Sequence, residues 1–510
     1  MNFKKINFLN ETVRNIALTI FSSFLIFLSY PKISISSLAF VALIPFILVI
    51  FNIKSLKNAL KYGFVFGFTT YLFLLYWIYI TLRAGDVNLL FSILGLILLC
   101  LILSVEFIII TSITFYAKQY GTVMMIFVLP SVWVLVDFFK VAITRYIPYF
   151  PWFQISYSQW NNPYILNLAY FGQSYSITFL IVFINAMLAS IFLEREKKQK
   201  IRRFITAFII ILISIIIGRM RYYDIETAFK NSKESIKIAT IQPSIDFYLK
   251  WDLTSIDYIQ SRIEALLKEV ETKKPSLIIW PENALYGWID DPAVFSWLCS
   301  CINSTKTNHI VGSVSKNDNK HVSLYYIDQK CEIKNEYNKR MLVPFGEYVP
   351  MRKFLGKYIS AITGLGEFSE GSMSQKPYEF IGFKIGNTIC YETVFNYLFY
   401  PDSDVDFFVN ITNDGWYLDT SAPYQHFAAA VMRSAETARP LVRSANNGIS
   451  AVIYPNGRIY SKLDLNEYGY IISELKKIDF PRPNDTEKNL TVYISLMITI
   501  AFAIAMLFRR

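Results

Sequence analysis

Long apolar runs with few charges are the feature that most restricts how this chain can fold. Eight runs occur, near residues 14–30, 36–53, 62–83, 87–116, 121–138, 165–193, 203–218 and 488–508. A helix needs about 20 apolar residues to cross about 30 Å of hydrocarbon, so the runs predict a membrane α-helical bundle of about eight spans. The run 203–218 is short for a span. The chain is 54% hydrophobic, which exceeds the roughly 45–50% of a soluble domain.

The stretch between the last two apolar runs has the composition of a globular domain. Expected strands lie at 236–241, 277–280, 309–314, 324–327, 383–390, 406–411, 449–454 and 468–473, and expected helices at about 255–274, 291–305 and 424–438. Strands that alternate with helices predict a layered α/β domain. We therefore expect a transmembrane bundle of seven spans over 1–219, a globular domain over 220–487 and a C-terminal transmembrane anchor over 488–510.

Positive charge in the connections predicts the orientation of the bundle. Basic residues cluster at the N-terminal end, after the second run (54–61), at 194–203 and at the final Arg509-Arg510. Basic connections stay on the cytoplasmic side, so we expect both termini there and the globular domain on the outer face. These clusters account for much of the net charge of +11, and they would contact anionic headgroups. We therefore expect a membrane partner and no nucleic acid.

The connection 139–164 is rich in aromatic side chains, among them Trp152, Phe153 and Tyr157. One interpretation is an interfacial aromatic belt. The other is a lid or a wall for lipid access beneath the outer domain. Both interpretations remain open from the sequence.

The five cysteines and three histidines do not form a metal-binding pattern. Cys299-x-Cys301 is not a CxxC motif, and His309, His321 and His426 show neither HExxH nor HxH spacing. We expect neither a metal nor another cofactor.

Three polar side chains sit where apolar strands are expected to end. Glu282 follows a proline-directed turn, where it is either a general base or a solvated turn carboxylate. Lys339 would usually be a surface charge, but it precedes a proline- and glycine-containing loop that suggests a fixed position. Cys390 is either a nucleophile at a strand-to-helix elbow or a buried cysteine. Together they supply a base, a cation and a thiol, the parts that acyl transfer needs.

The segments around these three residues resemble the Glu-Lys-Cys triad of the nitrilase (carbon-nitrogen hydrolase) superfamily. The string from Lys339 to Pro350 is similar to one family in particular, the bacterial apolipoprotein N-acyltransferases. Other strings similar to that family are Phe150-Pro-Trp-Phe-Gln154, Leu249-Lys-Trp-Asp252, Asn413-Asp-Gly-Trp416 and Arg443-Ser-Ala-Asn-Asn-Gly448. The eight-span layout adds to the resemblance, which runs along nearly the whole chain.

The resemblance implies a role for each matching residue. Cys390 would be the nucleophile, Glu282 the general base and Lys339 the cation that stabilises the oxyanion. Residues implied to support the pocket or the substrate are Glu347, a second carboxylate near the lysine, and Tyr391, Glu392, Trp251 and Trp416. The implied fold of 220–487 is an αββα sandwich.

The implied reaction transfers an acyl chain from a membrane phospholipid to a Cys390 thioester. From there it would pass to the N-terminal amine of the S-diacylglyceryl-cysteine of an apolipoprotein, in a ping-pong sequence. The enzyme would be a monomer in the bacterial inner membrane, with its catalytic domain on the periplasmic side. Residues 351–373, which contain four glycines, are expected to form a mobile lid. The alternatives are a membrane-tethered nitrilase-type amidase and a non-catalytic lipid carrier.

Overall fold

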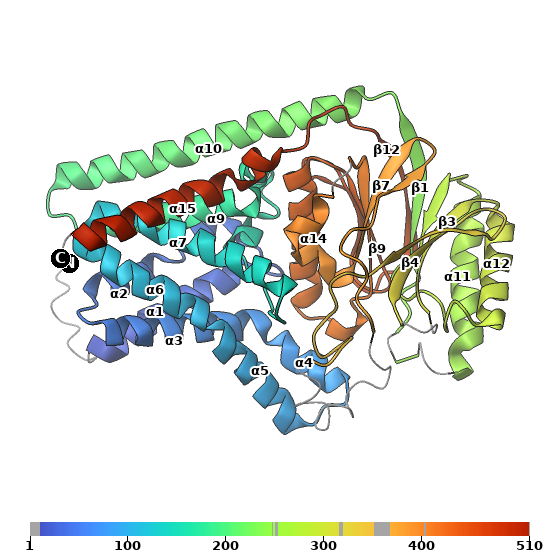
Figure 1. Ribbon diagram of the computed structural model, residues 1–510, viewed down its shortest axis with the longest axis horizontal. Helices are drawn as coiled ribbons and strands as arrows, with labels where there is room; N and C mark the ends of the chain where they lie inside the picture. Colours follow the sequence, from blue (N-terminus) through green and yellow to red (C-terminus); the bar gives the residue numbers. More distant parts are fainter. Residues whose placement is uncertain are drawn as a thin grey trace. The chain divides into compact units, whose positions relative to one another are not determined.

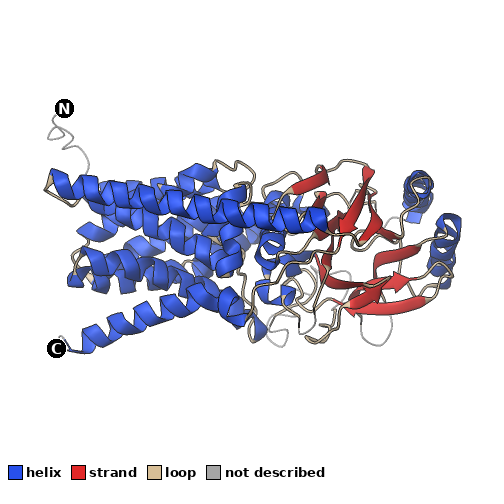
Figure 2. Cartoon of the chain, turned by 90° about the horizontal axis from the view of Figure 1, so that it is seen from above, coloured by secondary structure: helices blue, strands red, loops and turns tan. Residues whose placement is uncertain are grey.

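The computed structural model describes residues 11–246, 248–249, 253–315, 320–350, 368–401 and 404–508. The chain divides into two compact units. The helical unit consists of Met1–Arg83, Asn88–Tyr222 and Pro483–Arg510, and the sheet unit of Ala84–Val87 and Tyr223–Arg482. All strands in the described ranges belong to the sheet unit (Figure 2). The division after Tyr222 falls inside a continuous helix, three residues beyond the expected border at 219.

The helical unit is a bundle of apolar helices (Figure 1). Its elements are α1 (Glu11–Ser29), η2 (Ser36–Phe40), α2 (Ile44–Asn52), α3 (Leu56–Leu75), α4 (Trp77–Ala84), α5 (Leu89–Leu103), α6 (Val105–Ala117), η3 (Lys118–Tyr120), α7 (Thr122–Ala142), η4 (Ile143–Arg145), η5 (Ile155–Gln159), α8 (Pro163–Leu166), η6 (Asn167–Phe171), α9 (Gln173–Ile191), α10 (Lys197–Asn231) and α15 (Asp485–Phe508). Within the described part of the chain, six helices are long and apolar enough to cross a membrane. The pair α3 and α4, bent by 48°, makes a seventh if the two helices form one broken span. The other expected span corresponds to a shorter apolar helix, Ser36–Asn52.

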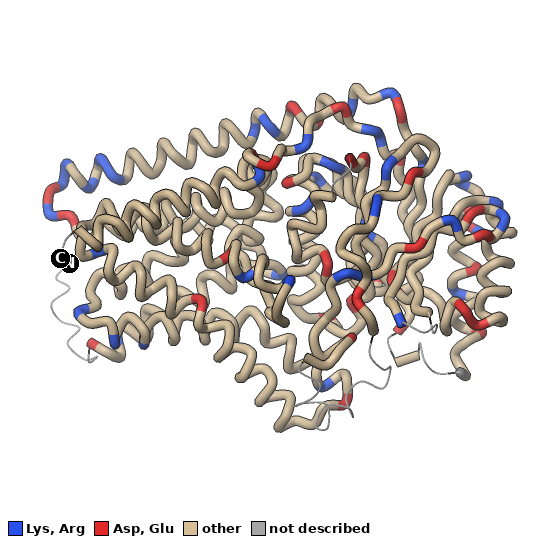
Figure 3. Tube along the Cα trace, in the orientation of Figure 1, with Lys and Arg blue, Asp and Glu red and all other residues tan. Residues whose placement is uncertain are grey.

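The apolar run 203–218 lies within a helix that is much longer than the run itself. It is the middle of α10, which has 35 residues from Lys197 to Asn231. Figure 3 shows a central stretch of α10 without charged residues and basic residues toward both of its ends. Bulky side chains on this stretch, such as Phe204 and Phe208, are exposed. Such an apolar surface is stable against lipid and unfavourable against water.

The aromatic connection 139–164 packs into the helical unit. Trp152, Phe153 and Tyr157 are all buried. Trp152 also contacts Trp77 of α4, with ring centroids 5.1 Å apart. The interpretation as an interfacial belt is therefore wrong for these three side chains, because a belt residue would face the membrane surface.

The sheet unit contains two six-stranded sheets among its described residues. Their orders are β12-β1-β2-β3-β4-β5 and β11-β10-β9-β8-β7-β6. The strands are β1 (Ser235–Gln242), β2 (Leu277–Ile279), β3 (Asn308–Val314), β4 (Val322–Ile327), β5 (Ile333–Asn338), β6 (Tyr378–Phe380), β7 (Phe383–Ile389), β8 (Phe407–Thr412), β9 (Leu441–Ala445), β10 (Ser450–Ile453), β11 (Ile459–Leu463) and β12 (Gly469–Lys476). The triplets β1-β2-β3 and β7-β8-β9 are parallel, and all other pairs are antiparallel.

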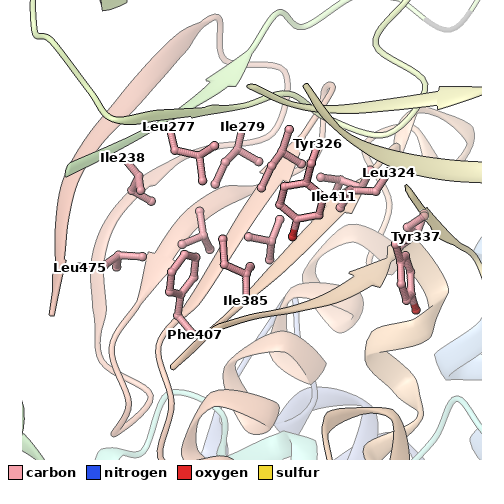
Figure 4. Close-up of a cluster of buried hydrophobic side chains, with 14 of the residues drawn as sticks. Ile238, Leu277, Ile279, Leu324, Tyr326, Tyr337, Ile385, Phe407, Ile411 and Leu475 are labelled. Carbon is pink, nitrogen blue, oxygen red and sulfur yellow. The ribbon is translucent and has the colours of Figure 1, made fainter. Parts of the chain in front are cut away.

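Apolar side chains fill the space between the two sheets. Figure 4 shows Ile238, Leu277 and Ile279 of the first sheet facing Ile385 and Phe407 of the second. The helices α11 (Ile256–Glu271) and α12 (Pro292–Thr305) connect parallel strands and bury a second apolar cluster against the outer face of the first sheet. The helix α14 (Ala422–Thr437) covers the second sheet (Figure 1). The αββα sandwich implied by the resemblance is confirmed.

A disulfide joins Cys299 of α12 to Cys331, which lies in the turn between β4 and β5. Their Cα atoms are 5.4 Å apart. The sequence did not predict this bond, because the spacing of five cysteines does not indicate which of them pair.

Candidate active site

The predicted triad residues each lie just after a strand. Glu282 comes shortly after β2, Lys339 directly follows β5, and Cys390 directly follows β7. Their exposed fractions are only 4%, 0% and 5%. Lys339 Nζ donates a hydrogen bond to Glu282 Oε1 at 3.1 Å. The charges of Glu282 and Lys339 both shift the pKa of the Cys390 thiol. The structure therefore brings the three residues together.

Lys339 is a buried cation held between two carboxylates. Its second contact is Glu347 Oε1, at 2.5 Å. Burial alone would lower the pKa of Lys339, but Glu282 and Glu347 outweigh burial and raise the pKa well above its usual value. Glu347 thus lies where the resemblance placed it, and its other oxygen accepts a hydrogen bond from the Val343 backbone N–H at 2.8 Å. The ammonium group is charged and fixed in position.

The carboxylate of Glu282 accepts from a backbone N–H, and the turn that carries it packs against β3. Its Oε2 accepts a hydrogen bond from the Asn413 N–H at 2.9 Å. Gly312 of β3 lies against the turn that carries Glu282. A Cβ atom at Gly312 would lie 2.3 Å from Pro281 O and 2.7 Å from the Cα of Glu282, so only glycine permits this approach.

Cys390 occupies an elbow between β7 and the short 3₁₀ helix η8 (Cys390–Val394). Its φ is +50°, in the left-handed region that residues other than glycine rarely adopt. Burial raises the pKa of the thiol, and so does the charge of Glu282, while Lys339 and a hydrogen bond with Thr412 act against them. The thiol is therefore protonated at neutral pH and needs a base to become a nucleophile.

Glu392 is completely buried and joins the segments that carry Lys339 and Cys390. Its Oε1 accepts from the backbone N–H of Arg340 at 2.6 Å, beside Lys339. Its Oε2 accepts from the N–H of Ile389 at 2.7 Å, beside Cys390, and from the Tyr337 hydroxyl at 2.8 Å. Glu392 therefore supports the site by holding the Lys339 loop to the Cys390 elbow.

The remaining expected site residues are less closely tied to the triad. Tyr391 is buried and packs edge-on against Phe395, with ring centroids 4.9 Å apart. Trp416 lies in the 3₁₀ helix η10 (Gly415–Tyr417) and is partly exposed. Trp251 and most of the expected lid, residues 351–367, lie outside the described residues.

A second buried cluster includes Cys390, and the sequence did not assign the cluster a role. Cys390 Sγ, a ring nitrogen of His426 and a carboxylate oxygen of Asp414 lie within 4.8 Å of one another. Both ring nitrogens of His426 and both carboxylate oxygens of Asp414 already contact protein atoms. This donor set is therefore poorly suited to a metal ion. Asp414 and Arg443 do belong to strings that carry the family resemblance, whereas His426 does not.

The buried Tyr417 is a further site residue that the sequence did not indicate. Burial raises the pKa of Tyr417, and the next largest influence on that pKa is Cys390. The Tyr417 hydroxyl and the Cys390 thiol therefore influence each other electrostatically. The only signal in the sequence was its position directly after the Asn413–Trp416 string.

Comparison with known proteins agrees with this architecture. Residues 22–187 match the family model of the apolipoprotein N-acyltransferase N-terminal domain, and residues 237–479 match that of carbon-nitrogen hydrolases. The apolipoprotein N-acyltransferase of Rickettsia typhi is 32% identical, over 84% of this chain and 86% of that protein. The one from Geobacter metallireducens is 29% identical, over 91% of this chain and 89% of that protein. A solved carbon-nitrogen hydrolase from Helicobacter pylori G27 has a TM-score of 0.35 and 13% identity, over 52% of this chain and 92% of that one. The chain belongs to the apolipoprotein N-acyltransferase family.

Proposed function

We propose that Cys390, Glu282 and Lys339 are the catalytic residues with which this bacterial membrane protein N-acylates apolipoproteins. The N-acyltransferase activity follows from the family. The triad and its two-step chemistry are our proposal. The observation that carries it is the buried Lys339 ammonium, held by Glu282 and Glu347 close enough to Cys390 to act on the pKa of its thiol.

In the first half-reaction, Glu282 accepts the thiol proton and the Cys390 sulfur attacks the ester carbonyl carbon of a membrane phospholipid. Lys339 and backbone N–H groups stabilise the oxyanion. The bond from the acyl carbon to the glycerol oxygen then breaks. The proton passes from Glu282 to that oxygen, and a lysophospholipid leaves an acyl thioester on Cys390.

In the second half-reaction, the free α-amine of an S-diacylglyceryl-cysteine attacks the thioester carbonyl. Glu282 accepts the amine proton, the carbon–sulfur bond breaks, and the proton returns to the Cys390 sulfur. The product is an N-acylated lipoprotein and the original enzyme. Both substrates keep their acyl chains in the bilayer, where each buried CH₂ group is worth about 0.8 kcal/mol, so a membrane-bound enzyme avoids extracting them.

The same proposal places the catalytic domain, expected over 220–487, on the periplasmic side of the inner membrane. Disulfides persist in the periplasm and are rare in the cytosol, so the Cys299–Cys331 bond supports that side. The basic residues near the start of α10 support a cytoplasmic end of that helix (Figure 3). With both termini cytoplasmic the number of spans is even, so Ser36–Asn52 would cross as a short span near the lower limit of about 17 residues.

A paired substitution of cysteines tests the nucleophile. Purified protein receives a phospholipid with a labelled acyl chain and a diacylglyceryl peptide, and mass spectrometry follows the label. Cys390→Ala should abolish transfer to the peptide. Cys301→Ala is the matched control, because Cys301 is also a buried free cysteine of the sheet unit. It should transfer at the wild-type rate.

The same assay separates the two alternatives. If water is the only acceptor of the Cys390-bound acyl group, the protein is an amidase-type hydrolase. If neither protein nor peptide gains mass, and Cys390→Ala behaves like the wild type, the chain is a lipid carrier and the proposed triad is wrong.

A further inference from the structure

We propose that His426 is a positioning residue that fixes the backbone of the nucleophile through the carbonyl oxygen of Cys390. Asp414 and Arg443 keep its ring in that position. This inference rests on the proposed function of Cys390 as the nucleophile. It concerns a side chain of α14, a helix that carries none of the triad residues.

The contact with Cys390 determines which ring nitrogen of His426 carries a hydrogen. His426 Nε2 lies 2.9 Å from Cys390 O. A carbonyl oxygen can only accept a hydrogen bond, so Nε2 must be protonated. The ring is 1% exposed, so water does not offer an alternative partner.

The other ring nitrogen has a partner in either charge state. His426 Nδ1 lies 3.0 Å from Arg443 Nη2 and 2.9 Å from Asp414 Oδ1. A neutral ring accepts from Arg443 there, and a protonated ring donates to Asp414. In both states Nε2 keeps its hydrogen on the Cys390 carbonyl. Burial lowers the pKa of His426, and Arg443 lowers it further, so the neutral ring prevails at neutral pH.

The ring is held in place by charges that are themselves fixed. Arg443 Nη2 donates to Asp414 Oδ2 at 2.9 Å, and both side chains are buried. Burial raises the pKa of Asp414, but opposing interactions led by the Arg443 guanidinium outweigh burial and bring the pKa to about 2. The carboxylate is therefore ionised throughout the working range of pH. This arrangement prevents the imidazole from turning away from Cys390.

The hydrogen bond from His426 acts on a residue whose backbone has an unfavourable conformation. Cys390 has a φ of +50°. The peptide that links Cys390 to Tyr391 is planar, and its C=O and N–H groups point in opposite directions. By holding the oxygen, His426 sets the direction of the Tyr391 N–H and the position of the thiol. In sharp nucleophile elbows that N–H contributes to the oxyanion hole.

His426 lies close enough to the sulfur to suggest a second role, as the base for the thiol. The contacts argue against that role. Nε2 already carries a hydrogen, and Nδ1 accepts from Arg443. A neutral ring in this state has no free lone pair for the thiol proton.

Two substitutions at position 426 test the inference. His426→Leu removes the donor, while His426→Gln can place an N–H near the position of Nε2. Three quantities are measured. Intact-protein mass spectrometry measures the acylation of Cys390 by phospholipid, steady-state kinetics give kcat and KM for phospholipid, and thermal unfolding gives the unfolding temperature. His309→Leu is the matched control, because His309 is also a buried histidine of the sheet unit and its ring hydrogen-bonds Trp280 and Thr305, away from Cys390.

We expect His426→Leu to lower kcat for acylation by about 100-fold with little change in KM, comparable to the loss of an oxyanion donor. His426→Gln should recover kcat to within about tenfold of wild type, because it restores the N–H. His309→Leu should lower the unfolding temperature as His426→Leu does, but leave kcat near the wild-type value.

Other outcomes overturn the inference. Three results would each exclude positioning through the carbonyl. They are a wild-type kcat in His426→Leu, a rise in KM alone in that variant, and a His426→Gln variant as inactive as His426→Leu. In those cases the acyl group still appears on Cys390 of the wild type, so the proposed function survives. If the wild type never gains acyl mass on Cys390, both the proposed function and this inference fail.

Discussion

The reactivity of Cys390 depends on opposing influences on its thiol. Burial and the negative charge of Glu282 raise the pKa of the thiol, and Lys339 and Thr412 only partly offset them. The thiol of Cys390 is therefore protonated in the resting protein. This state protects a buried thiol from chance oxidation, because the thiolate is the form that reacts. In the proposed mechanism, Glu282 accepts the proton at the moment of attack.

Glu282→Gln should separate titration of the thiol from catalysis. The substitution removes a negative charge that raises the pKa of Cys390, so the thiol should titrate at a lower pH than in the wild type. Acyl transfer should nevertheless fall by about 10²- to 10⁴-fold, because the base is lost. The rate of alkylation by iodoacetamide across pH 6–10 follows the ionisation of the Cys390 thiol. The amount of labelled peptide formed measures acyl transfer. Transfer at the wild-type rate would show that Glu282 is not the base, and a higher thiol pKa would contradict the effect of its charge on Cys390.

Sequence patterns indicated residues at the ends of strands better than residues on helices. Glu282, Lys339 and Cys390 follow apolar strands, so their polar character stands out from what precedes them. His426 lies within α14 among buried side chains, where a histidine resembles any other core position. Its role depends on contact with Cys390, 36 residues away in the chain, and sequence spacing carries no signal of such a contact.

Among the elements, apolar strands were predicted and polar strands were missed. All eight expected strands are present. The missed strands are β5, β6, β9 and β11. Three of them, β5, β6 and β11, are the outer or short strands of their sheets, where polar side chains face water. The strand β9 is buried but contains Arg443, whose charge is neutralised by Asp414 from a different segment.

The β3 strand positions Glu282, the proposed base, through Gly312. In Gly312→Ala, the added Cβ would meet the backbone of Pro281 at 2.3 Å, so the turn that carries Glu282 must move. We expect transfer to fall at least about tenfold and stability to fall by about 1–3 kcal/mol. The control is Gly469→Ala in β12, where the nearest atom is a flexible side-chain carbon of Leu463 at 3.3 Å. Equal activity of the two variants would contradict this account of Gly312.

The helical unit contains a buried ionic cluster that the sequence did not single out. Lys140 of α7 contacts Asp137 at 2.7 Å and Glu106 of α6 at 3.3 Å, and all three side chains are buried. Lys140 also donates to the backbone oxygen of Phe153 in the aromatic connection. The Tyr149 hydroxyl donates to Glu106 Oε1 at 2.5 Å. The cluster therefore ties α6 and α7 to the connection 139–164.

Removal of the single cation should destabilise the helical unit strongly. Lys140→Met leaves Glu106 and Asp137 without their counter-ion, which should cost about 3–5 kcal/mol. Lys118→Met is the control, because Lys118 donates to the backbone oxygens of Ile50 and Ile53. It leaves no buried carboxylate behind. Thermal unfolding in detergent, followed by size-exclusion chromatography, should show a much larger shift for Lys140→Met. Equal shifts would mean that the ion cluster contributes little.

At the scale of the whole molecule, the sequence predicted a globular domain inserted between the transmembrane helices along the chain. In the structure, the two units differ in where their apolar side chains lie. Apolar helices expose bulky side chains in the helical unit, while the sheet unit buries its apolar residues between layers. The run length predicted the helices well, because crossing hydrocarbon requires a long apolar run. It did not predict where α10 ends, because charged residues at both ends of that run continue the same helix. The monomeric state remains a prediction.

The disulfide gives a test of the proposed side of the membrane. Three cysteines are free, namely Cys100, Cys301 and Cys390, and two form the bond. The Cys390→Ala variant cannot carry an acyl thioester. Purified from native membranes under non-reducing conditions and alkylated in denaturant, it should gain two alkyl groups, and four after reduction. Four groups without reductant would indicate a reducing compartment and would contradict a periplasmic sheet unit.

The thioester on Cys390 is the central claim, and a single-turnover chase tests it most directly. The acyl-enzyme is formed with a phospholipid whose acyl chain carries ¹³C, separated from the phospholipid, and mixed with a diacylglyceryl peptide that has a free N-terminal amine. We predict that the label leaves Cys390 and appears in equal amount on the peptide amine, at least as fast as steady-state turnover. Release of the label as free fatty acid would contradict the account, and so would acylation of the peptide only while phospholipid is present.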